Sequence, residues 1–398
     1  KILIIIFLII LCIFLIFKGM NTKSKETTFT FWTIQLKAPS EDLIQKNIDE
    51  FQKRHKEIKI VWVDIPISEA QKRAIAAILG KNPPDLINLN PEFSSLLAQK
   101  NALEFFNEED AKEYNQSLVE NLKYEGKIYA LPFYATSAVT VLNKEKFKNC
   151  NVKLKTYDDI LKLSECKNPP VFGIALNEGD VFSKILNKYG IGENNLDSYK
   201  TDEVYKKFKK MNDEGLLLKD TLTINHREGI EKYMAESAAF ITAGSNFLTM
   251  IKQNAPNVYK TSVVYPQLTG EKKEYDVSVM NFVIPKYAKN KELAKEFINL
   301  ILNEENQLEF AKKTNVLPAN KRALNNSYFK NCGDDLIDKA RCIAARQLDF
   351  PLKSTFGVKS KKEINEVVNN SLEVLFLRGE KEFDAKRTTG DIKNLISF

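Results

Sequence analysis

The hydrophobic and polar positions of this chain alternate between strand-like and helix-like patterns. Residues 29–33 alternate aromatic side chains with threonine, which is typical of a β-strand. Ser40 and the two acids after it predict a helix start, because a hydroxyl and carboxylates satisfy the positive end of a helix. Residues 58–67 form a mostly apolar run that predicts a buried strand, residues 69–79 predict a helix, and residues 85–89 predict a third strand.

This order of elements predicts an α/β fold. Strand, helix, strand, helix, strand is typical of a mostly parallel sheet covered by helices, and ligands bind such sheets beyond the carboxyl ends of the strands. Asn290 is expected to cap a helix, and the chain from Leu324 onward has a largely helical pattern. The remaining predicted elements are helices over 93–100, 156–164 and 194–214, a turn and strand over 124–132, and strands over 138–142, 171–176 and 238–242.

The N-terminal segment has a different pattern from the rest of the chain. Residues 2–17 form an unbroken apolar run between Lys1 and Lys18. The length of this run lies between that of a long signal-peptide core and that of a short membrane-spanning helix. Residues 1–18 are therefore expected to be a membrane anchor or signal segment, and residues 19–27 a polar tether.

Cys12 lies inside this apolar run and raises a lipoprotein alternative. Leu11 precedes it, where a lipoprotein signal prefers a small residue, and more apolar residues follow where a mature N-terminus should turn polar. An uncut anchor, a lipidated Cys12 and a cleaved signal therefore all stay open as interpretations of this segment.

Charge and motif content narrow the function classes. The chain carries 59 Lys and Arg against 52 Asp and Glu, a net charge of +7 spread along its length, which does not favour nucleic-acid binding. It contains no G-x-S-x-G, P-loop, dinucleotide or H-E-x-x-H motif. Of its two histidines, His226 is expected to cap a helix, and no catalytic residue, metal site or cofactor is predicted. The carboxylate pair of an anchored glycoside hydrolase stays an unfavoured alternative.

Four cysteines beyond Cys12 form two close pairs along the chain. Cys150 lies near Cys166, and Cys332 lies near Cys342. An even number of cysteines in an exported protein favours disulfides, and neither pair has the C-x-x-C spacing of a metal site. Two local disulfides are therefore predicted if the chain is exported, and four free, buried thiols are the alternative.

Five segments carry motifs in a characteristic order. They are Phe-Thr-Phe-Trp-Thr at 29–33, Lys-Asn-Pro-Pro-Asp-Leu-Ile at 81–87, Leu-Ala-Gln-Lys-Asn-Ala-Leu at 97–103, Gly-Lys-Ile-Tyr-Ala-Leu-Pro at 126–132 with Leu-Asn-Lys-Glu-Lys-Phe at 142–147, and a helix pair ending in Leu-Pro-Ala over 288–319. In this order they resemble the family 1 extracellular solute-binding proteins, the maltose-binding-protein-like group. The resemblance runs from about residue 29 to the C-terminus.

The resemblance implies a periplasmic-binding-protein-like fold. Two α/β lobes would be joined by a hinge with three chain crossings, near residues 135, 278 and 327, after an N-terminal hydrophobic anchor helix. The expected division is lobe 1 over 28–134 and 279–326, lobe 2 over 136–277 and 328–385, and a C-terminal tail over 386–398.

The resemblance also implies a binding role. The protein would capture a sugar or oligosaccharide by closing two lobes over it, and would present the sugar to the permease subunits of an ABC importer in the membrane. It would act without a cofactor, as a monomer outside the cytoplasm, anchored through residues 2–17 or lipidated at Cys12. The alternatives are a non-sugar polar solute (a sugar phosphate, polyamine or peptide) and a receptor that reports to a membrane sensor.

Candidate ligand contacts follow from positions at strand ends and crossings, because aromatic rings pack against sugar C–H faces while polar groups fix hydroxyls. The expected contacts are Trp32, Thr33, Gln35, Glu92, Thr136, Ser137, Asn177, Glu178, Asn246, Phe247, Met280, Asn281 and Phe356. For Trp32 the alternative is core packing, and for Glu92 it is an exposed helix start. Asn177 and Glu178 fit a plain turn equally, and Phe356 fits helix packing.

Two departures from the family pattern bear on the solute rather than on the fold. Residues 278–281 are Ser-Val-Met-Asn, where the family usually carries two glycines. Residues 244–247 are Gly-Ser-Asn-Phe, without the aromatic residue that is common just after the glycine. Both segments are expected to line the cleft, so they leave the identity of the solute open.

Overall fold

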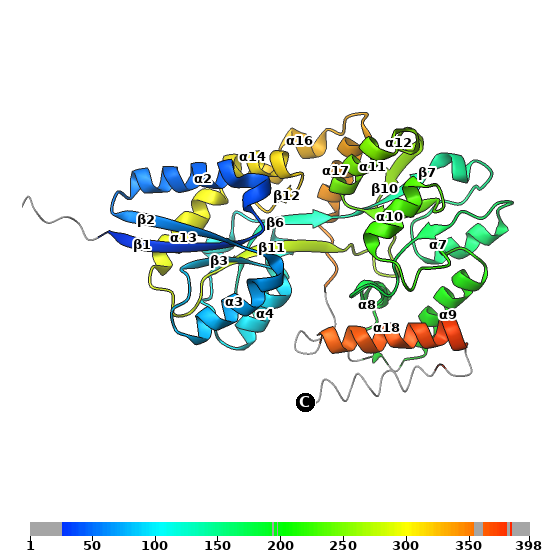
Figure 1. Ribbon diagram of the computed structural model, residues 1–398, viewed down its shortest axis with the longest axis horizontal. Coiled ribbons are helices and arrows are strands. Elements are labelled where there is room, and N and C mark those ends of the chain that lie inside the picture. The colour runs from blue at the N-terminus through cyan, green and yellow to red at the C-terminus, as the bar shows by residue number, and fades with distance from the viewer. Residues whose placement is uncertain (1–25, 193–194, 197, 354–360, 380–382, 384–398) are drawn as a thin grey trace, which may run out of the picture.

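Two β-sheets lie side by side along the long axis of the protein (Figure 1). The computed structural model describes residues 26–192, 195–196, 198–353, 361–379 and 383. The first sheet has the order β12 (Leu317–Pro318), β6 (Leu131–Ser137), β11 (Val277–Val283), β3 (Leu86–Leu89), β1 (Thr27–Ile34), β2 (Ile58–Ile65). The second sheet has the order β10 (Ser262–Tyr265), β7 (Val139–Asn143), β9 (Phe240–Ala243), β8 (Phe172–Gly173). A separate hairpin pairs β4 (Lys123–Tyr124) with β5 (Lys127–Ile128).

The first sheet is mixed rather than mostly parallel. β1 runs parallel to β2 and to β3, as the alternation of strands and helices predicts. β11 is antiparallel to both β3 and β6, and β12 is antiparallel to β6. The prediction of a mostly parallel sheet is therefore wrong beyond β3, because the chain re-enters this sheet from the second one and runs back along it.

Helices cover both faces of the first sheet. One face carries α2 (Lys37–Arg54) and α13 (Lys291–Ile301), with α14 (Glu304–Thr314) beside α2; the other carries α3 (Ile67–Leu79), α4 (Pro91–Gln99) and α6 (Gln116–Glu120). Phe31 and Phe282 pack with Phe297 of α13 on the first face. Ile87 packs with Leu97 of α4 on the second face. Alternate strand residues thus enter two separate cores, as the pleat of a strand requires.

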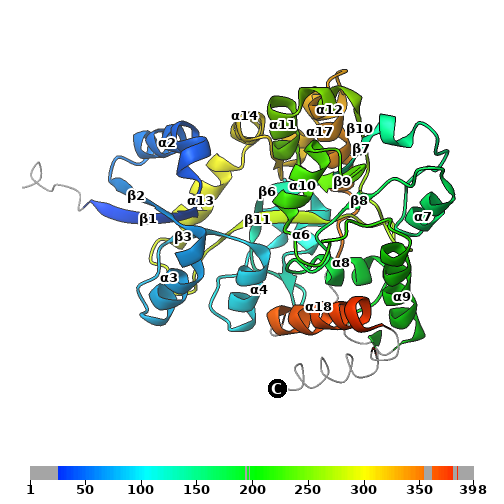
Figure 2. The same ribbon diagram turned by 45° about the vertical axis from the view of Figure 1, so that its right-hand side comes forward.

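Helices also cover both faces of the second sheet (Figure 2). One face carries α10 (His226–Met234), α11 (Ser245–Asn254), α12 (Pro256–Thr261) and α17 (Leu336–Gln347); the other carries α7 (Asp158–Leu161), α8 (Val181–Lys188), α9 (Tyr199–Asp213) and α18 (Lys361–Arg378). Short helices complete the described chain: α5 (Glu108–Ala111), η1 (Lys144–Phe147), η2 (Lys162–Glu165), α15 (Lys321–Leu324) and α16 (Ser327–Lys330). The predicted α/β class is therefore confirmed.

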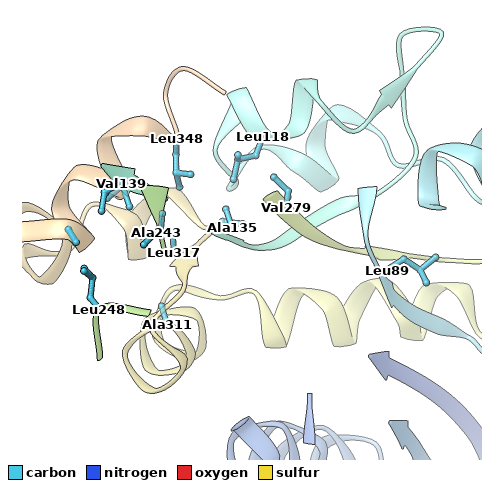
Figure 3. Close-up of a cluster of buried hydrophobic side chains, with 14 of the residues drawn as sticks. Leu89, Leu118, Ala135, Val139, Ala243, Leu248, Val279, Ala311, Leu317 and Leu348 are labelled. Carbon is cyan, nitrogen blue, oxygen red and sulfur yellow. The ribbon is translucent and has the colours of Figure 1, made fainter. Parts of the chain in front are cut away.

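A buried cluster of hydrophobic side chains joins the two sheets (Figure 3). Leu89 and Val279 enter it from the first sheet, and Val139 and Ala243 enter it from the second. Leu348, just after α17, lies in the same cluster. The two sheets are therefore packed into one continuous core where they meet.

Some local predictions differ in detail from the structure. Ser40 lies at a kink inside α2, and its hydroxyl donates to the carbonyl of Leu36 instead of capping the helix. Asn290 does precede α13, but its side-chain amide donates to Asp85 rather than capping the helix. Of the strand predicted over 171–176, only Phe172–Gly173 (β8) form a strand, although the carbonyl of Val171 also accepts from the backbone N–H of Ala239.

Both predicted disulfides are present. Cys150 bonds to Cys166, and Cys332 bonds to Cys342. The first closes a loop between η1 and η2, and the second ties the segment after α16 to α17. Each bond therefore fastens a peripheral segment to elements that pack around the second sheet.

The predicted anchor over residues 2–17, Cys12 and the tail over 386–398 lie outside the described residues. Within the part of the chain that the structure describes, no helix is both long enough and apolar enough to cross a membrane. The same described part contains no cluster of three or more His, Cys, Asp or Glu side chains that could hold a metal ion.

Candidate functional site

Three segments that run between the sheets meet in a buried hydrogen-bond network. The Nε2 of Gln267 donates to the Ser137 hydroxyl at 3.1 Å and to the carbonyl of Asp276 at 2.9 Å. The Nε2 of Gln347 donates to the same hydroxyl at 2.8 Å and to the carbonyl of Ala138 at 2.8 Å. We call Ser137, Gln267, Asp276 and Gln347 the junction network. Ser137, a predicted ligand contact, is therefore engaged inside the protein.

Lys188 extends the junction network into α8. Its ammonium is 2.8 Å from a carboxylate oxygen of Asp276 and donates to the carbonyl of Leu268 at 3.1 Å, and its side chain is only 1% exposed. Burial alone would lower the pKa of Lys188, but the interactions with Tyr157 and Asp276 outweigh it and the pKa is raised. Because α8 starts next to residues 177–180, it connects the junction network to that loop.

At the end of β1, the Trp32 ring is partly exposed and the Thr33 hydroxyl is buried. Trp32 is partly buried against the face covered by α3 and α4. Thr33 is fully buried, and its hydroxyl donates to Asp64 at 2.6 Å and accepts from the indole N–H of Trp62 at 2.8 Å. Gln35 is exposed and has a φ of 48°. Thr33 therefore holds β1 to β2, while Trp32 and Gln35 keep exposed surface.

Three further predicted residues lie where β6 and β11 pair. Thr136 is exposed and Met280 is half-buried. Asn281 is fully buried, and its Oδ1 accepts from the Ser94 hydroxyl at 2.9 Å while its backbone carbonyl accepts from Asn88 at 3.1 Å. Asn281 therefore ties α4 to the sheet through its oxygen atoms, while its buried Nδ2 has no acceptor among the described residues.

The loop between β8 and α8, residues 177–180, gathers predicted residues on the side of the second sheet. Glu178 accepts from the backbone N–H of His226 at 2.6 Å. The His226 ring packs edge-on against Phe247, with 5.1 Å between ring centroids. The Oδ1 of Asn177 is buried and has no hydrogen-bond donor among the described residues. This loop and the start of α11 therefore form one polar and aromatic surface.

Lys361, the first residue of α18, connects this loop to the first sheet. Its ammonium is 2.5 Å from Glu92 and 3.1 Å from Asp180. Glu92 lies in the first turn of α4, which Asn90 caps by accepting from the N–H of Phe93 at 2.9 Å. The predicted residue Glu92 therefore lies beside the 177–180 loop, although its helix α4 packs on the first sheet and the loop follows a strand of the second.

The ionisable groups of this region are held by their neighbours. Burial would raise the pKa of Asp180, but Lys184 and Lys361 outweigh it and the pKa is lowered. Burial would lower the pKa of Lys361, but Glu92 and Asp180 raise it. The pKa of His226 is lowered, because desolvation of the ring outweighs the nearby Glu178 carboxylate. The region therefore combines ion pairs of Lys361 and Asp180 with an imidazole whose protonation is disfavoured.

The structure thus separates the predicted residues into groups. Glu92, Asn177, Glu178 and Phe247 are linked through Lys361, Asp180 and His226; Trp32, Gln35, Thr136 and Met280 keep exposed surface on the first sheet; Thr33, Ser137 and Asn281 are engaged internally. Asn246 lies in α11, but its side chain is outside what the structure describes. Phe356 lies outside the described residues.

Sequence reasoning missed Lys361, Asp180 and the contact made by His226. The prediction that His226 caps a helix is wrong, because Asn225 is the cap of α10 and His226 is the first residue of that helix. The polar residues Lys361, Asn365 and Asn369 do recur every fourth residue, which is a visible stripe on one helix face. Nothing local in the sequence, however, pairs that stripe with Glu92.

A separate hollow of about 460 Å³ lies between β10 and the start of α17. Its lining includes Tyr259, Tyr265, Asp335 and Lys339. None of the predicted ligand contacts contributes to it, so it is distinct from the region around Glu92 and Asn177.

Comparisons with known proteins bear on this arrangement. A model of the bacterial extracellular solute-binding protein family matches residues 46–333. The chain is 25% identical over 303 residues to a binding protein of Brucella abortus, covering 71% of this chain and 70% of that protein. It is 26% identical over 285 residues to the diacetylchitobiose binding protein DasA of Streptomyces coelicolor, covering 66% of each.

The fold also matches solved structures. The sugar-binding protein MalE of Xanthomonas citri superposes with a TM-score of 0.79 at 16% identity, over 93% of this chain and 98% of that one. MalE of Listeria monocytogenes in complex with maltose superposes with a TM-score of 0.74 at 18% identity, over 94% and 99%. At these identities the likeness shows a shared periplasmic-binding-protein-like α/β fold.

Proposed function

This chain belongs to the bacterial extracellular solute-binding protein family, and we propose that it captures a sugar or oligosaccharide between two lobes. Lobe 1 is assigned to residues 28–134 with 279–326, and lobe 2 to residues 136–277 with 328–385. The strand order supports this division, since nearly all of the first sheet falls in lobe 1 and the whole of the second sheet falls in lobe 2. The junction network is then the hinge between them.

The observation that carries the proposal is the meeting of Glu92 from lobe 1 with the 177–180 loop of lobe 2. Beside this meeting point, the buried Oδ1 of Asn177 lacks a donor among the described residues. A sugar hydroxyl is a suitable donor for it, and the rings of Phe247 and Trp32 suit sugar C–H faces. The proposed contacts are Trp32, Gln35, Glu92, Thr136, Asn177, Glu178, Asn246, Phe247, Met280 and Phe356.

The relatives support a carbohydrate over other polar solutes. One of them is a diacetylchitobiose binding protein, and the family consists of binding proteins, so we assign no bond-making step to this chain. We further propose that the ligand-bound form is recognised by the permease subunits of an ABC importer. Residues 2–17, or a lipid on Cys12, would keep the monomeric protein at the outer face of the membrane.

A thermal-shift screen of the full chain against mono- and oligosaccharides, sugar phosphates, polyamines and peptides tests the proposal. A ligand at a hundred times its Kd stabilises the folded state by about 2.7 kcal/mol, which raises the Tm measurably. We expect a shift with one class of sugar. That shift should be lost in Trp32→Ala and reduced in Asn177→Ala.

Trp62→Phe is the matched control, because Trp62 lies on β2, next to the strand of Trp32, but its indole bonds to Thr33 inside the protein. This variant should lower the Tm without ligand yet keep the ligand-induced shift. A shift only with a non-sugar solute would discard the sugar while keeping the binding role. A sugar shift that survives both Trp32→Ala and Asn177→Ala would place the site elsewhere.

A further inference from the structure

A single side chain connects the two lobes beside the proposed ligand site. Lys361 begins α18, which packs against α8 and α9 of lobe 2. Its ammonium lies 3.1 Å from Asp180 of the same lobe and 2.5 Å from Glu92 of lobe 1. The Lys361–Glu92 pair therefore exists only while the lobes are as close as in this structure.

The lobe 2 side of this contact is firmly fixed. Lys361, Asn365 and Asn369 recur every fourth residue, so they lie on one face of α18. Asn365 accepts from the Ser183 hydroxyl of α8 at 2.6 Å. Asn369 donates to the carbonyls of residues 177 and 179 at 3.1 and 3.0 Å. This polar stripe on α18 holds the 177–180 loop in place and positions Lys361 next to lobe 1.

On lobe 1, the Glu92 side chain can separate from Lys361. The Glu92 side chain is 54% exposed, so it can return to water when the lobes part. Asp180 is 21% exposed and also pairs with Lys184 at 2.9 Å, so it stays neutralised after separation. Breaking the Lys361–Glu92 pair thus leaves no buried charge unpaired, which is what a reversible contact requires.

A second contact between the lobes carries no charge. The hydroxyl of Ser245 in α11 donates to the backbone carbonyl of Asn315, which follows α14, at 3.0 Å. Because this bond does not involve an ionised group, salt should affect it little. The Lys361–Glu92 pair is thus the charged contact on the side of the proposed ligand site, while Lys312 of α14, whose ammonium lies 5.4 Å from the centre of the Tyr328 ring, makes another near the crossing at residue 327.

We propose that Lys361 is a positioning residue that holds the two lobes closed by pairing with Glu92, and that it thereby strengthens solute binding. The inference rests on the proposed two-lobe function, because it assumes that the lobes move apart and together. The polar stripe on α18 holds the 177–180 loop and also carries Lys361. A solute bound against this loop therefore favours the same closed arrangement of the lobes as the Lys361–Glu92 ion pair does.

Small-angle X-ray scattering of the ligand-free full chain tests the bridge without knowledge of the solute. We expect Lys361→Ala to raise the radius of gyration relative to wild type at low salt. Wild type should expand to the same value in about 1 M salt, where the screening length is only about 3 Å. Lys362→Ala is the matched control, since Lys362 is 85% exposed and contacts Glu366 of its own helix; it should behave as wild type.

Two further variants separate a bridge from general damage to α18. Lys361→Arg keeps the charge and should restore the compact form. Glu92→Gln should expand the protein as Lys361→Ala does, and the double variant should expand it no further, because both changes remove one contact. With the solute found by the thermal-shift screen, Lys361→Ala should weaken binding by up to about five-fold, the upper end of the range for exposed ion pairs.

Equal radii of gyration for Lys361→Ala and Lys362→Ala would overturn the bridge, as would additive effects of the Glu92 and Lys361 changes. These results do not depend on the solute. A failed ligand screen with a positive scattering result would instead reject the proposed function and leave the contact between the lobes standing.

Discussion

The side-chain amide of Gln347 donates to the hydroxyl of Ser137 at 2.8 Å, and this bond fastens the end of α17 to the end of β6. Gln267, from the segment between β10 and β11, donates to the same hydroxyl. Both glutamines are 2% exposed. One serine thus holds three segments that are far apart in the chain, which is why we assign it to the proposed hinge.

Gln347→Leu should destabilise the protein, although leucine is similar in size and uncharged like glutamine, because Gln347 is buried and hydrogen-bonded. It removes the acceptor of the buried Gln267 backbone N–H, which donates to Gln347 at 2.8 Å. A buried donor without an acceptor costs about 1–3 kcal/mol. Urea unfolding measures this loss. Gln45→Leu, at an exposed position of α2, should change the free energy of unfolding by less than about 0.5 kcal/mol, and equal effects of the two changes would refute the role of the junction network.

Lys188→Met should be more damaging, because it leaves the carboxylate of Asp276 without its partner in the junction network. Breaking a fully buried ion pair costs about 3–5 kcal/mol, and because the Asp276 side chain is 31% exposed the loss should lie at the lower end of that range or below it. Lys200→Met breaks an exposed pair with Glu271 and should cost less than about 1 kcal/mol. Similar losses for both variants would show that the junction does not depend on Lys188.

The same lysine predicts a dependence on alkaline pH. The pKa of Lys188 is raised in the folded protein, so its contribution is complete below the unfolded value of about 10.4 and is lost as the pH rises through the folded value. Wild type and Lys188→Met should therefore converge in stability only at strongly alkaline pH. Urea unfolding at pH 8 to 12 measures this, and a constant difference up to the highest pH would contradict it.

Asp335 predicts an acid-sensitive contribution at the start of α17. Partial burial would raise its pKa, but Lys252, Tyr259 and the N–H of Ile337 lower it to about 2. A depressed pKa means that this contribution is present above the unfolded value of about 3.9 and is lost as the pH falls toward 2.

Asp335→Asn isolates the charge, since asparagine is also a good helix cap. It should be less stable than wild type at pH 7 and equally stable near pH 2, as measured by urea unfolding across this range. Asp334→Asn, at the exposed neighbouring position, should show no such convergence. A stability difference for Asp335→Asn that stays constant down to pH 2 would argue against the charge.

Replacing both Cys150 and Cys166 with serine should lower the free energy of unfolding by about 2–4 kcal/mol, the range for native disulfides that close loops of this size. Chemical denaturation of the variant against wild type measures it. Both cysteines are replaced together so that neither is left as a free thiol. An unchanged midpoint would mean that the unfolded chain is not restrained by this bond.

Local features were predictable from the sequence, and long-range ones were not. The strand at 29–33 and the helix at 69–79 were recovered because their hydrophobic periodicity is a local property. β11 was not among the predicted strands, and its antiparallel direction could not be predicted either, because periodicity carries no information on whether a strand runs parallel or antiparallel. The disulfides were predictable because each pair is close in the chain.

The candidate site shows the same division. Thr33 has the right position for a ligand contact at a strand end, but its partners Asp64 and Trp62 come from the next strand and occupy its hydroxyl. The contact of Lys361 with Glu92 joins residues 269 positions apart, and no local pattern marks it. Position along a strand thus indicates candidate residues, but the partner of each polar group decides which side chains stay exposed.

The order of strands in the first sheet also governs how the chain can fold. This sheet takes strands from Thr27 to Pro318, and β6 lies between β11 and β12, which are made after it. The strands of the second sheet all lie between Val139 and Tyr265. A chain synthesised only as far as residue 276 therefore holds a complete second sheet, while β6 still lacks both neighbours in the first. Such late, long-range pairing slows folding and leaves open strand edges until synthesis is nearly finished.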